Sequence, residues 1–383
     1  MPEHYLLIGA DVVPTDSNLE HFKSGDAGAL VGDALLPVLN AADGRLFNLE
    51  VPLTDQKAPI IKNGPHLHAP TAAIAGYKAI GANIVTLANN HILDQGAQGL
   101  QATVETLDRA GIAHVGTGGS VAEASKPFIF EFAGKSIGIY ACAEHEFSIA
   151  GEASPGANPF DPLFSLDHVV ELKSKTDYVI VLYHGGKEHY PYPSPNLQRV
   201  CRRLVDKGAD LVVCQHSHCI GCEEKYCGGT IVYGQGNFIF DGSKRECWQT
   251  SLLIKLKDDF TVAYIPLVKA GHAVRLADEN KGNEIIAAFE ARSEEIKAPG
   301  FIEKSYVRFA EGFLPTYLKR YAGKRPLLFR MTNRLTKGRL LQSYTEKAYG
   351  VPEMLGIVNY TDCEAHRELL LKGLEQSIRK AKK

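Results

Sequence analysis

The sequence predicts an α/β fold with mixed β-sheets, followed by a helical C-terminal region. Over residues 1–265, short β-rich runs alternate with helical patterns, which is typical of an α/β domain. Two pairs of adjacent β-rich runs are joined by short turns and predict hairpins, so the sheets should contain antiparallel as well as parallel strands. After about residue 270 the strand signals stop and helical periodicity dominates.

The predicted strands are short runs of mostly apolar, β-branched and aromatic residues. In chain order they cover 5–10, 45–48, 83–87, 112–115, 178–183, 211–214 and 231–233. The two predicted hairpins pair 128–132 with 136–140 and 252–256 with 260–265. Helices are predicted over 29–40, 71–80, 97–109 and 196–207, and the second and third end at Gly81 and Gly111, as expected for C-terminal caps.

The C-terminal part differs from the rest in charge as well as in periodicity. The chain has 42 basic and 44 acidic residues, yet residues 1–274 carry a formal charge of −9 and residues 275–383 one of +7. We predict a boundary near residue 272, which separates a domain of residues 1–272 from a basic helical region of residues 273–383. Helices are expected there over 284–297, 313–321 and 365–380.

Residues 304–347 are the most basic segment, with 11 Lys or Arg against two acidic residues. Apolar residues are interleaved with the charges, so helices could bury one face and present a cationic one. We expect the segment to bind an anionic polymer or an anionic membrane surface, or to dock another protein, and the alternative is a solvated helical subdomain. Nucleic acid is not expected as a partner, because no helix-turn-helix, zinc-finger or RNP-like signature is present.

Composition excludes several classes of protein. With 45% hydrophobic and 22% charged residues, the chain is neither wholly disordered nor a coiled coil. No stretch approaches the roughly 18–20 apolar residues of a membrane span, and the N-terminus lacks the pattern of a signal peptide. We therefore expect a location in the cytoplasm or at the periphery of the membrane. The eight cysteines are too few for a disulfide scaffold and are interpreted as reduced thiols.

Potential metal ligands follow several of the strand-like runs directly. A single histidine after a strand is usually a polar loop residue, but here five runs deliver such side chains to what could be one rim. The pair of His216 and His218 gives the strongest indication of a metal site, since residues i and i+2 of an extended segment project to the same side. Imidazole with carboxyl or amide oxygen suits a hydrolytic Zn, Mn or Fe centre of one or two ions. The predicted ligands are Asp11, Glu50, Asn90, His184, His216 and His218.

Further residues are predicted around this centre. His91 could protonate a leaving group, and Asp94, three residues on, either orients His91 or caps the helix that begins near residue 97. Four residues are candidates for substrate contacts, with a solvated loop or a turn as the alternative: Lys62, Lys187, Glu188 and Asn237.

Six motifs, in this order, resemble those of the capsule-synthesis CapA family. They are Asp11 after its apolar strand, "NLEVPLT" at 48–54, "LANNHILDQG" at 87–96, "HGGKE" at 184–188, "CQHSH" at 214–218 and "YGQGNFIFD" at 233–241. The resemblance covers about residues 5–268. CapA-like proteins are linked to poly-gamma-glutamate and other capsular polymers, and they resemble the calcineurin-type metallophosphoesterases. The resemblance therefore implies two mixed sheets packed face to face, with helices outside.

The resemblance also implies roles for individual residues. Asp11 matches the first metal carboxylate, Asn90 and His91 match the Asn-His pair, and Glu50 takes the place of the bridging carboxylate. His184 matches the isolated metal histidine, and the His216–His218 pair matches the final His-x-His, which divides between two metals. The sequence departs from the metallophosphoesterase pattern at Val13, where a histidine is expected, and at the Asn48-Leu49-Glu50 motif.

The expected function is that of a metal-dependent hydrolase of the CapA type. It would act in the synthesis or processing of a capsular or other surface polymer, and the bond cleaved would be a phosphoester. Cleavage or transfer of an amide or acyl linkage is the alternative chemistry. The alternative from another class of function is a noncatalytic, metal-binding component of capsule assembly. The expected partners are an anionic polymer or a phosphorylated substrate, and a membrane surface or capsule-assembly protein through residues 304–347.

Overall fold

The computed structural model describes residues 3–321, 327–362, 366, 370–371, 374, 378 and 380–381. The chain divides into two units, Met1–Glu303 and Lys304–Lys383. The division therefore falls after Glu303 and not near residue 272, where we expected it. Residues 271–272 form the turn between β15 (Val262–Ala270) and β16 (Ala273–Leu276), a strand that the sequence did not predict. Helix α8 (Glu279–Glu295) then packs on β15, which ties it to the first unit.

The first sheet has eight strands and is mixed, as predicted. Its order is β16-β15-β14-β1-β2-β3-β4, and β13 pairs with β1. Strands β1 to β4 are parallel, whereas β14 runs antiparallel to both β1 and β15. The strands not yet given are β1 (Tyr5–Val12), β2 (Gly44–Leu49), β3 (Ile84–Thr86), β4 (Ala113–Val115), β13 (Asn237–Ile239) and β14 (Thr250–Lys257).

The second sheet has six strands in the order β11-β12-β10-β9-β7-β6. Its four central strands are parallel, and the edge strands β6 and β11 are antiparallel to their neighbours. The strands are β6 (Phe128–Phe132), β7 (Lys135–Ala143), β9 (Tyr178–His184), β10 (Leu211–Gln215), β11 (Glu223–Tyr226) and β12 (Gly229–Val232). Two short strands, β5 (Thr117–Gly118) and β8 (Gly156–Ala157), form a separate pair.

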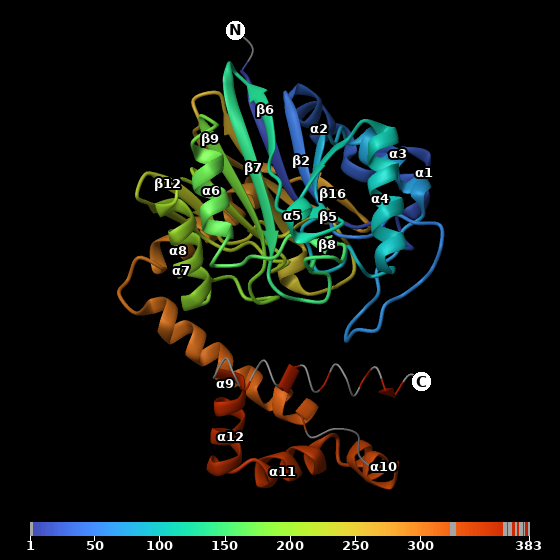
Figure 1. Cartoon of the computed structure of the whole chain (residues 1–383), viewed down its shortest axis with the longest axis vertical. Helices are drawn as coiled ribbons and strands as arrows, with labels where there is room; N and C mark the ends of the chain where they lie inside the picture. The colour runs from blue at the N-terminus through green and yellow to red at the C-terminus, as the bar shows by residue number, and fades with distance from the viewer. Residues whose placement is uncertain are drawn as a thin grey trace. The chain divides into compact units, whose positions relative to one another are not determined.

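Side chains that alternate between the two faces of each strand create the layers. In β1, Leu6 and Ile8 belong to the core between the two sheets, whereas Leu7 belongs to the core under the helices. Ile139 and Ile180 enter the inter-sheet core from the second sheet. Both sheets are thus covered on their outer faces by helices (Figure 1). The predicted face-to-face packing of two mixed sheets is confirmed.

Each outer layer has its own set of helices. The first sheet is covered by α1 (Leu19–Ser24), α2 (Ala27–Ala41), η1 (Thr71–Ala73), α3 (Ile74–Ala79) and α4 (Gly96–Ala110). The second is covered by α6 (Ser165–Lys173) and α7 (Pro195–Asp206). The short α5 (Val121–Ala124) and η2 (Glu246–Trp248) lie in connecting segments. Gly25 and Gly111 end α1 and α4 in the left-handed region, which a residue with a Cβ adopts at a cost.

The second unit is helical over its described residues, as predicted. Its elements are α9 (Phe301–Tyr321), which begins in the first unit, α10 (Leu327–Leu335), α11 (Arg339–Ala348) and α12 (Val351–Asp362). The helix predicted over 365–380 lies largely outside the described residues. Among the residues that the structure describes, no helix is both long and apolar enough to cross a bilayer.

Gly9 provides a test of the packing in the first sheet. A Cβ at this position of β1 would lie 2.4 Å from Cδ1 of Phe47, whose ring packs on Phe238. We expect Gly9→Ala to lower the free energy of unfolding by about 1–3 kcal/mol, as overpacking of a core does. Urea unfolding followed by circular dichroism measures it. Gly28→Ala is the matched control, because a Cβ there meets only ordinary contacts, and equal stability of the two variants would contradict the packing.

Candidate metal centre

The candidate ligands lie at the carboxyl ends of strands from both sheets. In the first sheet, Asp11 is near the end of β1 and Glu50 follows β2 directly. In the second sheet, His184 is the last residue of β9, and His216 and His218 follow β10. Strands β1 and β2 are parallel, as are β9 and β10, so each sheet brings its own ligands to one edge. The packing of the two sheets then brings the two sets of ligands together.

Two groups of potential metal ligands share one carboxylate. Glu50, His184 and His216 form the first group, and Asp11, Glu50 and His218 form the second. Within each group the ligand atoms lie within 4.8 Å of one another. Glu50 is therefore the residue that the two groups have in common.

The spacing of these atoms fits a metal ion. Two ligands bound to one ion by bonds of about 2.0–2.2 Å lie about 3.0–3.4 Å apart at ordinary coordination angles. His184 Nε2 is 3.3 Å from Glu50 Oε1 and 3.1 Å from Asn90 Oδ1, and His218 Nδ1 is 3.2 Å from Asp11 Oδ2. Asn90 thus adds an amide oxygen beside the first group. Each of the three distances is therefore one that two ligands of the same cation would have.

The burial of Glu50 also favours a metal ion at this site. Its side chain is fully buried, and among the residues that the structure describes neither carboxylate oxygen has a hydrogen-bond partner. A buried carboxylate without partners is costly unless a positive charge compensates it. The donor set of imidazole, carboxylate and amide oxygen fits a divalent transition metal.

The two histidines after β10 titrate in opposite directions. Burial lowers the pKa of His216 well below its ordinary value, and the neighbouring His184 and His218 lower it further. Burial also acts to lower the pKa of His218, but Glu50 and Asp11 outweigh it and raise that pKa to about 9. His216 is therefore a neutral imidazole, the form that binds a metal ion, whereas the raised pKa of His218 reflects its contact with the two carboxylates.

The backbone at these two histidines is not extended, contrary to the prediction. His216 has a φ of 87° and His218 a φ of 54°, so both lie in the left-handed region. This conformation turns the two rings into different ligand groups. Residues with a Cβ adopt it only when the surroundings impose it, and it is concentrated at functional sites.

His91 belongs to a buried charged cluster beside the ligands. Its Nδ1 donates a hydrogen bond of 2.6 Å to Oδ2 of Asp94, which is fully buried. Asp94 thus contacts His91 as predicted. It is not the cap of α4, whose N-cap is Gln95. Lys62 was predicted to contact substrate, but its ammonium is ion-paired with Asp94 and lies 3.2 Å from His91 Nδ1, and its side chain is only 1% exposed.

The other three predicted substrate contacts have different surroundings. Asn237 lies in β13 beside Asp11, and its Oδ1 is 2.8 Å from His218 Nδ1, the ring nitrogen that also faces Asp11 Oδ2. Its amide oxygen therefore lies beside the second ligand group. Lys187 and Glu188 lie on the loop after β9, where Glu188 Oε2 is 3.9 Å from His189 Nδ1. Their contacts with a substrate remain predictions.

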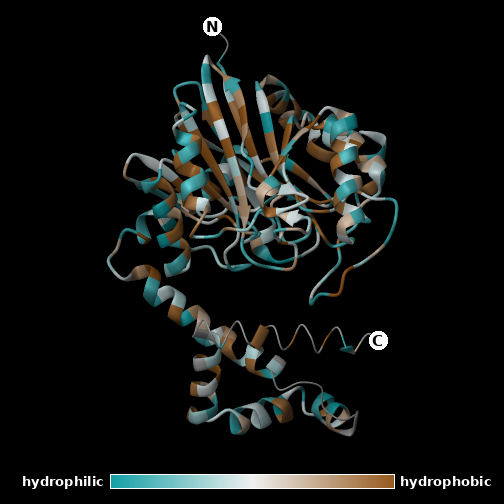
Figure 2. Cartoon of the chain, viewed as in Figure 1, coloured by the Kyte–Doolittle hydropathy of each residue, from teal (hydrophilic) through white to brown (hydrophobic). Residues whose placement is uncertain are grey.

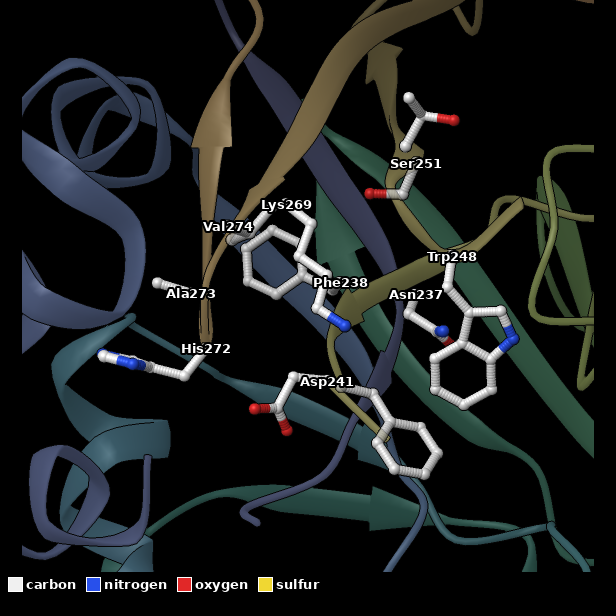
Figure 3. A pocket seen from close by; sticks show the side chains of 11 residues that line it. Asn237, Phe238, Asp241, Trp248, Ser251, Lys269, His272, Ala273 and Val274 are labelled. Carbon is white, nitrogen blue, oxygen red and sulfur yellow. The ribbon is translucent and has the colours of Figure 1, made fainter. Parts of the chain in front are cut away.

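Trp248 packs against the ring of His218. The two ring centroids are 4.6 Å apart. Figure 3 shows Trp248 and Asn237 at the edge of a small pocket, together with Phe238, Asp241 and Lys269. The ring of His218 is thus restrained both by its contact with Trp248 and by its contact with Asn237.

Three residues of the site were not predicted from the sequence. Asn48 donates a 2.7 Å hydrogen bond to Asp11 Oδ1 and lies 3.3 Å from His184 Nδ1, and Asn89 donates to Asn48. Glu146 accepts a 2.7 Å hydrogen bond from Asn90 Nδ2. Asn48 and Asn89 lie within the quoted motifs, next to predicted ligands, so their position was a usable signal. Glu146 lies in an irregular segment, where no motif or strand pattern in the sequence pointed to it.

Comparison with known proteins identifies the family. A model of the family described as "Bacterial capsule synthesis protein PGA_cap" matches residues 7–242, a range that contains both ligand groups. The chain belongs to this family. The resemblance to CapA proteins stated from the motifs is confirmed.

Relatives of the PGA_cap chain carry related names. The "PGA biosynthesis protein CapA" of Bacillus subtilis is 30% identical over 212 residues, which are 54% of this chain and 55% of the relative. A "Probable polyglutamine synthesis accessory protein" of Mycobacterium tuberculosis is 30% identical over 230 residues, or 55% of this chain and 59% of the relative. The chain thus spans about half the length of these curated relatives.

Solved structures align with the PGA_cap chain at low similarity. A 5'-nucleotidase precursor from Thermus thermophilus aligns with a TM-score of 0.42 and 15% identity, over 74% of this chain and 58% of the other. A novel phosphatase from Mycoplasma pneumoniae aligns with a TM-score of 0.41 and 14% identity, over 70% of this chain and 94% of the other.

The buried pair of Lys62 and Asp94 yields a stability prediction. Asp94→Ala would leave the Lys62 ammonium buried without a counter-charge, so we expect the free energy of unfolding to fall by about 3–5 kcal/mol. Urea unfolding of both proteins measures it. Glu20→Ala, which breaks an exposed pair with Lys23, is the control and should cost less than about 1 kcal/mol. A similar loss in both variants would mean that the Lys62–Asp94 pair is not buried in solution.

Proposed function

We propose that this PGA_cap protein is a metal-dependent hydrolase that acts in the synthesis or processing of a capsular or related surface polymer. The observation that carries the proposal is the pair of buried ligand groups that share Glu50. Two adjacent ions held in this way are characteristic of hydrolases that cleave phosphoesters and peptides. The polymer is suggested by the relatives, which are named for PGA biosynthesis and polyglutamine synthesis.

In this proposal His184, His216 and Glu50 hold one ion and Asp11, His218 and Glu50 hold a second, with Asn90 beside the first. We propose Mn, Zn or Fe, since all three accept mixed nitrogen and oxygen ligands. When bound, such an ion supplies Lewis acidity, which polarises the scissile group and makes hydroxide available at neutral pH.

The proposed part of His91 is proton transfer. Asp94 holds its Nδ1 at 2.6 Å, which leaves Nε2 as the ring nitrogen available to a substrate. A histidine fixed in this way can protonate the leaving group or stabilise negative charge that develops on it. Asp94 orients the ring, and Lys62 neutralises the carboxylate that does so.

The bond cleaved distinguishes two versions of the proposal. We favour a phosphoester, on the resemblance of the ligand motifs to those of metallophosphoesterases. Cleavage or transfer of an amide or acyl linkage is the second version, because paired metals also serve peptidases. After loading with Mn, Zn or Fe, the protein should be assayed with nitrophenyl phosphate monoester and diester and with a γ-glutamyl anilide. Turnover of the anilide alone would favour the second version.

A noncatalytic role is the rival from another class. The chain would then bind polymer or a partner enzyme through the edge of the sheets that carries the candidate ligands. Metal binding without turnover of any of the three substrates, in a preparation whose metal content matches the two groups, would favour this role.

Glu50 provides the test of the metal centre. Because it belongs to both ligand groups, we expect Glu50→Gln to lose most of the bound metal from both. Elemental analysis of the purified, dialysed protein measures the content. Glu188→Gln is the matched control, since this carboxylate lies on the loop after β9 but in neither group. Equal metal content in wild type and Glu50→Gln would overturn the assignment.

His91 provides the test of catalysis. We expect His91→Ala to lower kcat by about 10²–10⁴-fold, the usual loss on removal of a general acid, while the metal content stays near that of the wild type. The measurement is turnover of whichever substrate the screen identifies, paired with elemental analysis of the same sample. Near-normal turnover would remove His91 from the mechanism, whereas a parallel loss of metal would assign it to the metal centre.

A further inference from the structure

Exposed apolar side chains are concentrated in the second unit. Among the described residues, six large apolar side chains are exposed before residue 304, and eleven are exposed between residues 304 and 362. The second segment is much the shorter of the two. Figure 2 shows the apolar positions along its helices. Contiguous apolar surface of this kind marks a site of interaction with a protein or a membrane.

These side chains recur at helical spacing. In α12, Val351, Leu355 and Val358 are 65%, 63% and 56% exposed, and positions i, i+4 and i+7 lie on one side of a helix. In α9, the exposed side chains of Val307, Leu314, Tyr317 and Tyr321 likewise fall on one side. A stripe with this spacing is the face that a surface helix normally buries.

Cationic side chains flank the apolar ones on α10. Met331 and Leu335, four residues apart, are 58% and 84% exposed. Arg330 and Arg334, also four residues apart, precede each of them by one position and are exposed as well. The helix therefore offers apolar and cationic groups on adjoining sides.

The combination of the two kinds of group identifies the partner. Residues 304–347 carry 11 Lys or Arg and two acidic residues, so the partner should be anionic. An anionic polymer would pair with the cations but leave the apolar stripes in water. A second copy could cover the stripes but would bring like charges together. An anionic bilayer accommodates both, since apolar side chains enter the acyl boundary while Lys and Arg remain among the headgroups.

We propose that the helices of residues 304–321 and 327–362 bind the surface of an anionic membrane, with the exposed stripes of α9, α10 and α12 in the interface. The tyrosines of these stripes fit this position, because their rings are amphipathic and prefer the headgroup region. The inference uses none of the metal ligands, so it stands or falls separately from the proposed hydrolase activity.

Flotation of the full chain with lipid vesicles tests the proposal. The vesicles are phosphatidylcholine alone, or phosphatidylcholine with about one-third phosphatidylglycerol, at about 0.05 M and about 0.5 M salt. The protein should float with the anionic vesicles at low salt, less at high salt, and not with the neutral ones. Failure to float with anionic vesicles at low salt would overturn the proposal.

Paired variants separate the two contributions. Met331→Ser with Leu335→Ser should cut the floated fraction by about five-fold or more, through loss of apolar insertion. Arg330→Gln with Arg334→Gln should weaken binding and flatten its salt dependence. Leu163→Ser with Phe164→Ser, an exposed apolar pair of the first unit, is the matched control and should float as the wild type does.

Two further outcomes would overturn the membrane assignment. If Met331→Ser with Leu335→Ser floats as the wild type does, with circular dichroism showing the helices intact, the apolar stripe is not the contact. If the wild type does not float but is retained by immobilised polyglutamate, or runs as a dimer that this variant disrupts, the partner is the polymer or a second copy.

Discussion

The burial of the Glu50 carboxylate is the constraint on which the site depends. Both of its oxygens lie out of contact with solvent, and no hydrogen-bond partner for them lies in the described part of the chain. Such a group persists in a folded protein only if its surroundings compensate its charge. The neighbouring imidazoles of His184, His216 and His218 belong to the other sheet, so the two sheets must meet at this edge with little freedom.

The inter-sheet core supplies that restriction. Ile8 of β1 packs with Ile180 of β9 and Val213 of β10, three to five residues before the ligands Asp11, His184 and His218. Protein interiors are close-packed, so a shift of one sheet over the other would disturb these contacts before it separated the ligands. The polar atoms of Asn48 and Asn237 then fix individual ligands within the space that the core defines.

The layered fold and the convergence of the candidate ligands at one edge could be predicted from the sequence because both depend on local patterns. A strand is recognised by its composition, and its carboxyl end by the polar residue that follows, as at His184 and Glu50. Residues whose role depends on distant partners were missed or misinterpreted. Lys62 reaches Asp94 across 32 positions, and Asn90 donates to Glu146, which lies in a loop without a strand pattern. Strand β16 pairs with β15 and packs against α2, more than 230 residues earlier in the chain. Such contacts leave no periodic trace in the chain.

The left-handed backbone at His216 and His218 has a consequence for the stability of the whole domain. A residue with a Cβ in this region gives up about 1–3 kcal/mol that a glycine would retain. Folding stability alone would therefore favour glycine or asparagine at both positions. The two imidazoles stand at the rim at the expense of a more stable fold.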